Sequence, residues 1–301
     1  MERHKIFFQL FVLLAALFIN SFFFRGDFNF LKKNVSVPPL KKNDYIPEPS
    51  VSASSTLVVR LNTGEALYQK NADEKRAIAS LTKLMTGALL FEQTDPLALI
   101  TFDEDTKKLS DPTAKKSEVP VGETIKWEDA AKLLLVESDN DAAFAIAEAS
   151  SSVADFVRAM NQKAAEIGMP QTHFANPAGI DDSKNYSTAA DLQKLIRYIY
   201  EKHNELWGIT RTVAGEIISV SGKEYHFAST NQLLKEMPDK IYGGKTGMTD
   251  EAQGALILLY QPMPRETVSI IILGSRDRFQ DARNIMQWLN AAFVWPQPKS
   301  K

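Results

Sequence analysis

Three short motifs in this 301-residue chain contain the residue types of a serine acyl-transfer site. They are Ser80-Leu81-Thr82-Lys83, Ser138-Asp139-Asn140 and Lys245-Thr246-Gly247. A serine hydroxyl is a poor nucleophile until a nearby base accepts its proton, and a lysine can be that base only when its pKa is lowered. If Ser80 opens a helix, Lys83 lies one turn further along on the same face. The spacing therefore predicts a nucleophile and its base.

The three motifs differ in how much each indicates alone. A Ser-x-x-Lys is expected about once by chance in a chain of this length. A Ser-x-Asn is no rarer, and a second copy, Ser229-Thr230-Asn231, is interpreted as structural. Lys-Thr-Gly occurs once. It is the order and setting of the three motifs together that indicate an acyl-transfer site. The first motif begins a helical pattern, the second follows an apolar helix and the third enters a strand-rich C-terminal region.

The elements that position the motifs follow from hydrophobic periodicity and turn residues. A helix is predicted from Ser80 to about Glu92. Strands near both ends of the chain, with helices between them, predict an α/β (α+β) fold with one antiparallel sheet covered by helices and a separate helical lobe. The predicted strands are 57–61, 65–69, 213–220, 223–228, 255–260 and 267–273. The other predicted helices are 127–137, 141–149, 153–167, 188–203 (opened by a capping box at Thr188 and Asp191) and 277–293.

The composition argues against several classes of function. A net charge of −2 argues against nucleic acid as a partner. The absence of cysteine excludes a thiol nucleophile and a cysteine zinc site. Four histidines are too few and too scattered for a metal cluster, so His173, His203 and His226 are interpreted as surface or structural residues. No metal or other cofactor is expected.

The N-terminal region predicts a membrane anchor or an export signal. From Ile6 to Phe24 run 19 mostly apolar residues, which is longer than a usual signal-peptide core, and no small-x-small cleavage pattern follows. Residues 1–25 are therefore predicted to be an uncleaved membrane anchor, with a cleaved signal peptide as the alternative. Residues 26–55, rich in Pro and Ser, are predicted to be a flexible linker, and residues 56–297 the catalytic domain.

The residues around the motifs resemble the D-alanyl-D-alanine carboxypeptidase family of penicillin-binding proteins, the serine-type enzymes of low molecular mass. The resemblance runs from about Thr56 to Phe293. It implies a three-layer β-lactamase/transpeptidase-like fold and a peptidase that removes the terminal D-alanine from peptidoglycan stem peptides ending in D-Ala-D-Ala. It also implies acylation by β-lactams as covalent inhibitors. It rests on five segments: 62–68, 79–85, 138–143, 172–180 and 243–247.

The resemblance also assigns roles around the nucleophile. Ser80 would form the acyl-enzyme after Lys83 accepts its proton. A free lysine has a pKa of about 10.4, so the pKa of Lys83 must fall by roughly three units, through burial and a second cation. Lys245 is the expected cation. The backbone N–H groups of Ser80 and Met248 would form the oxyanion hole.

The remaining motif residues are expected to bind substrate. Lys245 and Thr246 would hold the terminal carboxylate, and Gly247 would permit close backbone approach. Ser138 would relay a proton to the leaving D-alanine, and Asn140 would hold Lys83 and the substrate amide.

Three alternatives stay open at this point. An endopeptidase that cuts D-alanyl cross-links would use the same residues. A class A β-lactamase would need a glutamate in a Glu-x-x-Leu-Asn segment, and Glu166, the glutamate in the right general region, lacks that context. A non-catalytic penicillin-binding sensor domain would keep Ser80 and Lys83 without efficient turnover.

Overall fold

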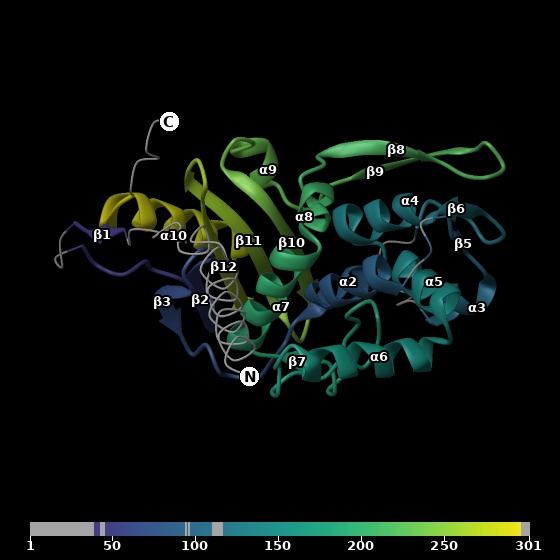
Figure 1. Ribbon diagram of the computed structural model, residues 1–301, viewed down its shortest axis with the longest axis horizontal. Coiled ribbons are helices and arrows are strands. Elements are labelled where there is room, and N and C mark those ends of the chain that lie inside the picture. Colours follow the sequence, from purple (N-terminus) through teal and green to yellow (C-terminus); the bar gives the residue numbers. More distant parts are fainter. Residues whose placement is uncertain (1–38, 43–45, 94, 96, 110–116, 296–301) are drawn as a thin grey trace, which may run out of the picture. The chain divides into compact units, whose positions relative to one another are not determined.

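The computed structural model describes residues 39–42, 46–93, 95, 97–109 and 117–295. Its centre is a five-stranded antiparallel sheet with strand order β10-β11-β12-β2-β3 (Figure 1). The N-terminal hairpin joins the C-terminal strands because β2 pairs with β12, for example Val58 with Ile270. This confirms the predicted sheet built from both ends of the chain. The strands are β2 Ser55–Arg60, β3 Glu65–Lys70, β10 Ile241–Thr249, β11 Gln253–Met263 and β12 Glu266–Ser275.

Alternate residues of each strand enter two different hydrophobic cores, which makes the fold three-layered. Val58 packs in one core with Ile285 and Leu289 of α10 (Arg278–Ala292), whereas Leu57 and Val59 pack in the other. That second core contains buried side chains of α7 (Ala189–Lys202) and α8 (Asn204–Thr210). Because side chains alternate between the faces of a strand, both faces of the sheet are covered.

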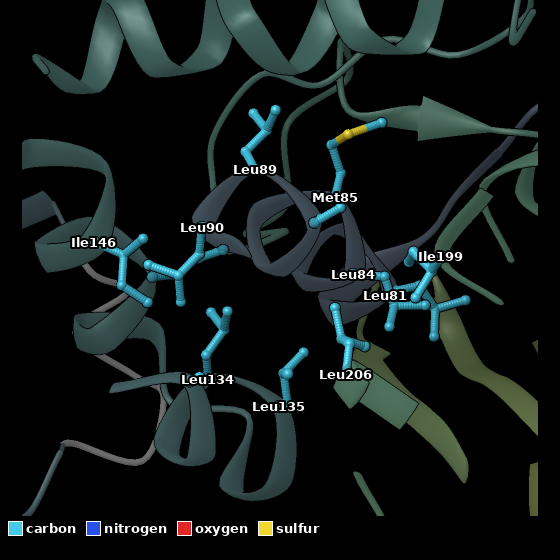
Figure 2. Close-up of a cluster of buried hydrophobic side chains, with 14 of the residues drawn as sticks. Leu81, Leu84, Met85, Leu89, Leu90, Leu134, Leu135, Ile146, Ile199 and Leu206 are labelled. Carbon is cyan, nitrogen blue, oxygen red and sulfur yellow. The ribbon is translucent and has the colours of Figure 1, made fainter. Parts of the chain in front are cut away.

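A helical lobe surrounds α2 (Lys83–Gln93), which is apolar on most of its surface. Leucine, isoleucine and methionine side chains from α2, the segment 133–137, α5, α7 and α8 meet around it (Figure 2). A helix buried on all sides is held in place by packing, so its first residues are fixed relative to the sheet. The other helices of the lobe are α3 Glu104–Leu109, α4 Trp127–Lys132, α5 Asn140–Ser150 and α6 Val153–Glu166.

Four small two-stranded sheets and one short helix complete the described chain. The predicted 213–228 hairpin is present as a sheet separate from the central one. These elements are β1 Leu40–Lys41 with β13 Phe293–Val294, β4 Arg76–Ala77 with β7 Tyr186–Ser187, β5 Leu99–Thr101 with β6 Thr124–Lys126, β8 Ala214–Ile218 with β9 Glu224–Ala228, and α9 Leu233–Glu236.

The predicted linker, residues 26–55, extends too far toward the C-terminus. The backbone N–H groups of Ser52 and Ala53 donate to the buried carboxylate of Asp281, and Ala53 is fully buried. The last residues of that segment therefore belong to the folded unit. The predicted anchor, residues 1–25, lies outside the described residues. Of the helices in the described part of the chain, none has the length and apolar character needed to cross a membrane.

Candidate active site

Ser80 lies in a short 3-10 turn, η2 (Ala79–Thr82), that leads directly into α2. The predicted helix therefore begins with a tighter turn, and Ala79 before the serine has a positive φ of 47°. The Nζ atom of Lys83 lies 2.9 Å from the Oγ atom of Ser80. The spacing of the first motif thus brings the two side chains into hydrogen-bonding contact, as predicted.

Lys83 is fully buried, and its amine has two further partners besides Ser80. Nζ donates to the side-chain oxygen of Asn140 at 2.6 Å and to the backbone carbonyl of Ala178 at 2.6 Å. Burial lowers the pKa of Lys83 to about 7, while Asp139 acts in the opposite direction. The amine is therefore available as a base near neutral pH.

The second motif follows a helix that changes its winding. The predicted helix 127–137 consists of α4 and a five-residue π-helical segment, η3 (Leu133–Glu137). Ser138 then has a left-handed backbone with φ 68°, which is rare for a residue with a side chain. This local conformation directs the Ser138 hydroxyl to Lys245, whose Nζ atom donates to it at 2.7 Å.

The third motif lies on the edge strand β10. Lys245 is 1% exposed, and its amine also donates to the backbone carbonyl of Thr246 at 3.0 Å. A Cβ atom on Gly247 would lie 3.1 Å from the backbone nitrogen of Ser80. The backbone of β10 therefore lies close to Ser80 at Gly247, where a close backbone approach was expected. The next residue, Met248, has an exposed side chain.

Burial is the main cause of the lowered pKa at both buried lysines. The pKa of Lys245 is lowered well below its ordinary value, first by burial and then by the positive charges of Lys83 and Arg278. For Lys83, burial is the cause that lowers the pKa, and it is one of the two causes expected from the sequence. The two amines therefore influence each other's charge, because repulsion between two cations disfavours the ammonium form.

The segment Asn176-Pro177-Ala178-Gly179 is a part of the site to which sequence reasoning gave no role. The Asn176 side-chain oxygen accepts hydrogen bonds from three successive backbone N–H groups, at residues 178–180. This turn presents the Ala178 carbonyl to Lys83. Gly179 has φ +81°, and a Cβ atom there would lie 2.0 Å from the Ala79 carbonyl oxygen. In the sequence, the Asn-Pro-Ala-Gly string was the feature that could have indicated this part of the site.

Two further residues border the site. Thr230, from the second Ser-x-Asn copy, forms a hydrogen bond between its hydroxyl and that of Thr246, so this copy borders the third motif. Arg278 at the start of α10 is close enough to lower the pKa of Lys245. Its Nε atom is buried without a hydrogen-bond partner among the described residues. Arg278 belongs to none of the sequence motifs, so the sequence alone did not indicate that it borders the site.

Two other groups lie apart from the motif residues. Glu166 is exposed at the end of α6 and pairs with Lys163 at 3.2 Å, as expected of a helix-surface residue. Within the described part of the chain, one set of possible metal ligands, Glu216, Glu224 and His226, lies exposed on the β8–β9 hairpin. Such exposed acidic groups are common without a metal.

A buried lysine that is hydrogen-bonded to a serine next to a Lys-Thr-Gly edge strand, in a three-layer fold, is the arrangement of the penicillin-recognising serine enzymes. The sequence profile described as D-alanyl-D-alanine carboxypeptidase matches residues 42–274. The chain belongs to this family, which confirms the resemblance seen in the sequence.

Known relatives include both peptidase types and a DD-transpeptidase. The chain is 30% identical to the D-alanyl-D-alanine carboxypeptidase DacF of Bacillus subtilis, over 80% of its own length and 62% of that protein. It is 30% identical to the D-alanyl-D-alanine endopeptidase of Escherichia coli, over 83% and 81%. The crystal structure of the Streptomyces K15 DD-transpeptidase superimposes with a TM-score of 0.76 at 27% identity, covering 82% of this chain and all of that one.

Proposed function

We propose that this protein is a serine-type D-Ala-D-Ala carboxypeptidase that acts on peptidoglycan stem peptides and is acylated by β-lactams. One observation carries the proposal. As an ammonium, Lys83 can donate to Ser80, Asn140 and Ala178, but a neutral amine keeps only two N–H groups. The Ala178 carbonyl and the Asn140 side-chain oxygen can only accept. The lone pair of neutral Lys83 therefore faces the Ser80 hydroxyl.

Acylation follows from this geometry. Lys83 accepts the Ser80 proton as Oγ attacks the carbonyl of the penultimate D-alanine. The backbone N–H groups of Ser80 and Met248 stabilise the developing oxyanion, and this role is supported by the close approach of β10 at Gly247. The C–N bond then breaks and the acyl group remains on Ser80.

The leaving group needs a proton and its carboxylate needs a binding site. The proton that Lys83 accepted from Ser80 passes through the Ser138 hydroxyl to the D-alanine nitrogen, and the hydrogen bond from Lys245, which fixes that hydroxyl in the site, supports this role. Lys245, Thr246 and Arg278 bind the terminal carboxylate, because charge-assisted bonds to a carboxylate are the strong ones. Water finally hydrolyses the acyl-enzyme, which leaves a stem peptide shortened by one residue.

The second candidate is cleavage of D-alanyl cross-links. The Escherichia coli endopeptidase and that of Pseudomonas aeruginosa, 31% identical, are matched over 81% and 86% of their lengths, whereas the Bacillus subtilis carboxypeptidase is matched over 62%. The same nucleophile and base would serve both reactions. The two candidates differ in whether the leaving amine belongs to a free D-alanine or to another stem peptide.

We also propose that the catalytic unit works outside the cytoplasm, tethered by residues 1–25. The support is the apolar run Ile6–Phe24 and the location of peptidoglycan. A cleaved signal peptide would give the same side of the membrane without the tether. Membrane fractionation of the full chain distinguishes the two.

The deciding experiment measures products from two substrates. A stem pentapeptide and a cross-linked muropeptide are incubated with the protein and with Ser80→Ala. D-alanine release from the pentapeptide that disappears in the variant supports the carboxypeptidase. Cleavage of the cross-link alone makes the protein an endopeptidase. Stable labelling by penicillin without either product overturns both in favour of a sensor.

A further inference from the structure

A cavity of about 710 Å³ lies between the β8–β9 hairpin and the helical lobe, and the proposed acyl-transfer steps do not use it. Its volume is within the range of small-molecule binding sites, roughly 300–1,000 Å³. The hairpin extends over α4 and β6 (Figure 1), and the N–H of Val220 near its tip donates to the Thr124 carbonyl at 2.8 Å. The hairpin wall of the cavity is therefore attached to the lobe at its outer end.

The inner end of the cavity adjoins the residues that are proposed to act on the leaving group. Glu137 lines the cavity and precedes Ser138, and Ala228 lines it and lies two residues before Thr230. The N–H of Thr230 donates to a carbonyl of η3 at 3.2 Å, so the two walls meet there. The Thr230 hydroxyl is hydrogen-bonded to that of Thr246. Because Ser138 protonates the leaving nitrogen and Thr246 binds the leaving carboxylate in the proposed mechanism, the cavity lies beside the leaving residue.

The lining of the cavity combines apolar and acidic side chains. Ala214 and Ala228 are paired across the hairpin, and the ring of Phe227 also lines the cavity. Three carboxylates line it as well, two from the lobe and one from β8: Glu118, Glu137 and Glu216. Among the described residues that line the cavity there is no lysine or arginine. An alkyl chain that ends in a positive charge suits this combination, because its stem packs on apolar surface while its charged end stays near water and the carboxylates.

We propose that this cavity is a subsite for the side chain of the leaving D-amino acid, and that it takes an unbranched alkyl chain ending in an amine. The proposal rests on the proposed function, because Ser138 and Thr246 are assigned to the leaving residue there. The bond that breaks is the same amide, and the acyl group passes to Ser80 and then to water as before. A leaving D-alanine places only a methyl group beside the cavity, whereas a longer side chain gains apolar contact. The carboxylates attract an amine and repel an anionic side chain of the same length.

The test compares four stem pentapeptides that differ only in the last residue, which is D-alanine, D-norleucine, D-lysine or D-2-aminoadipate. Release of that residue is measured at pH 8, where an ordinary imidazole is neutral, because His226 also lines the cavity. The kcat/KM for the D-norleucine peptide should equal or exceed that for the D-alanine peptide. The kcat/KM for the D-lysine peptide should exceed that for the D-2-aminoadipate peptide about tenfold, since each exposed charge pair contributes a few-fold.

Two variants separate the room in the cavity from its charge. Ala214→Leu fills part of the cavity and should lower kcat/KM for the D-norleucine peptide, relative to that for the D-alanine peptide, about tenfold. Ile218→Phe is the matched control, because it enlarges another exposed side chain of β8 that does not line the cavity, so the ratio should stay unchanged. Glu216→Gln should lower the ratio of D-lysine to D-2-aminoadipate release about threefold. Each result is a ratio within one variant, so a partial loss of folded protein cancels.

Three results would overturn the proposal. They are a D-norleucine peptide hydrolysed more than about tenfold more slowly than the D-alanine peptide, equal rates for D-lysine and D-2-aminoadipate, and a norleucine-to-alanine ratio that Ala214→Leu leaves unchanged. Release of none of the four last residues by the wild type would instead refute the proposed function.

Discussion

The rate of Ser80 acylation should fall on the acidic side with an apparent pKa of about 7, because Lys83 must be neutral to accept the proton. From that value, the neutral fraction of Lys83 is about nine tenths at pH 8, one half at pH 7 and one tenth at pH 6. The acylation rate should therefore rise about tenfold from pH 6 to pH 8 and then level off. Stopped-flow measurement with a fluorescent penicillin gives the rate over this range.

Two variants make this prediction specific to Lys83. Lys83→Arg places a group that does not lose its proton beside Ser80, so acylation should be lost at every pH. His173 lies on the same loop segment as Ala178 and provides the control substitution. His173→Asn should keep the profile. A rate that is flat between pH 6 and 8, or an acidic limb that moves in His173→Asn, would refute the role of Lys83.

Three further outcomes follow from buried or strained groups. The pKa of Lys83 is about 10.5 in the unfolded chain and about 7 in the folded one, so between these values the unfolded chain binds one proton more. The free energy of unfolding of the wild type, measured in urea, should therefore rise by about 1.4 kcal/mol per pH unit between pH 7 and 10, relative to that of Lys83→Met. Gly179→Ala should lower the free energy of unfolding by about 3 kcal/mol, because the new Cβ atom would clash with the backbone of Ala79. Gly122→Ala is the control: Gly122 also has a positive φ but open space around it, so the loss should be about 1 kcal/mol. Equal losses in the two variants would contradict the clash. Arg278→Gln should raise the KM for a stem pentapeptide about tenfold with a smaller change in kcat, and an unchanged KM would remove Arg278 from carboxylate binding.

The fold was predictable where local pattern and final packing agree. Alternation marked the strands of the central sheet, apart from β10. Half of the predicted capping box is confirmed, because the Thr188 side chain accepts from the N–H of Asp191 at 3.0 Å. The Asp191 carboxylate instead accepts from the backbone N–H of Gln171 and the hydroxyl of Thr172. The short elements β5, β6, α3 and α9 were not predicted. Their lengths of three to six residues are too short for a periodic pattern. Packing against the rest of the protein determines their conformation: β5, β6 and α3 pack in the helical lobe, whereas the buried Leu233 and Leu234 of α9 belong to the core that contains α10.

The site was predictable where chemistry requires a particular side chain and less so where it uses the backbone. Ser80, Lys83 and Lys245 carry functional groups that motif spacing identifies. The Ala178 carbonyl, by contrast, is a backbone group, and any residue at that position offers one. Its position depends on the Asn176 turn and on Gly179, which are visible in the sequence only as a string without an assigned role.

The two buried lysines are expected to respond differently to a substrate carboxylate. Burial and mutual repulsion disfavour two ammonium groups in one buried site, and the pKa of Lys245 is lowered well below its ordinary value. A substrate carboxylate placed against Lys245 would act in the opposite direction, because an opposite charge at close range favours the ammonium form. In the proposed mechanism, Lys245 then binds the substrate carboxylate and Lys83 serves as the base. Substrate recognition and proton transfer are thereby assigned to two different buried amines.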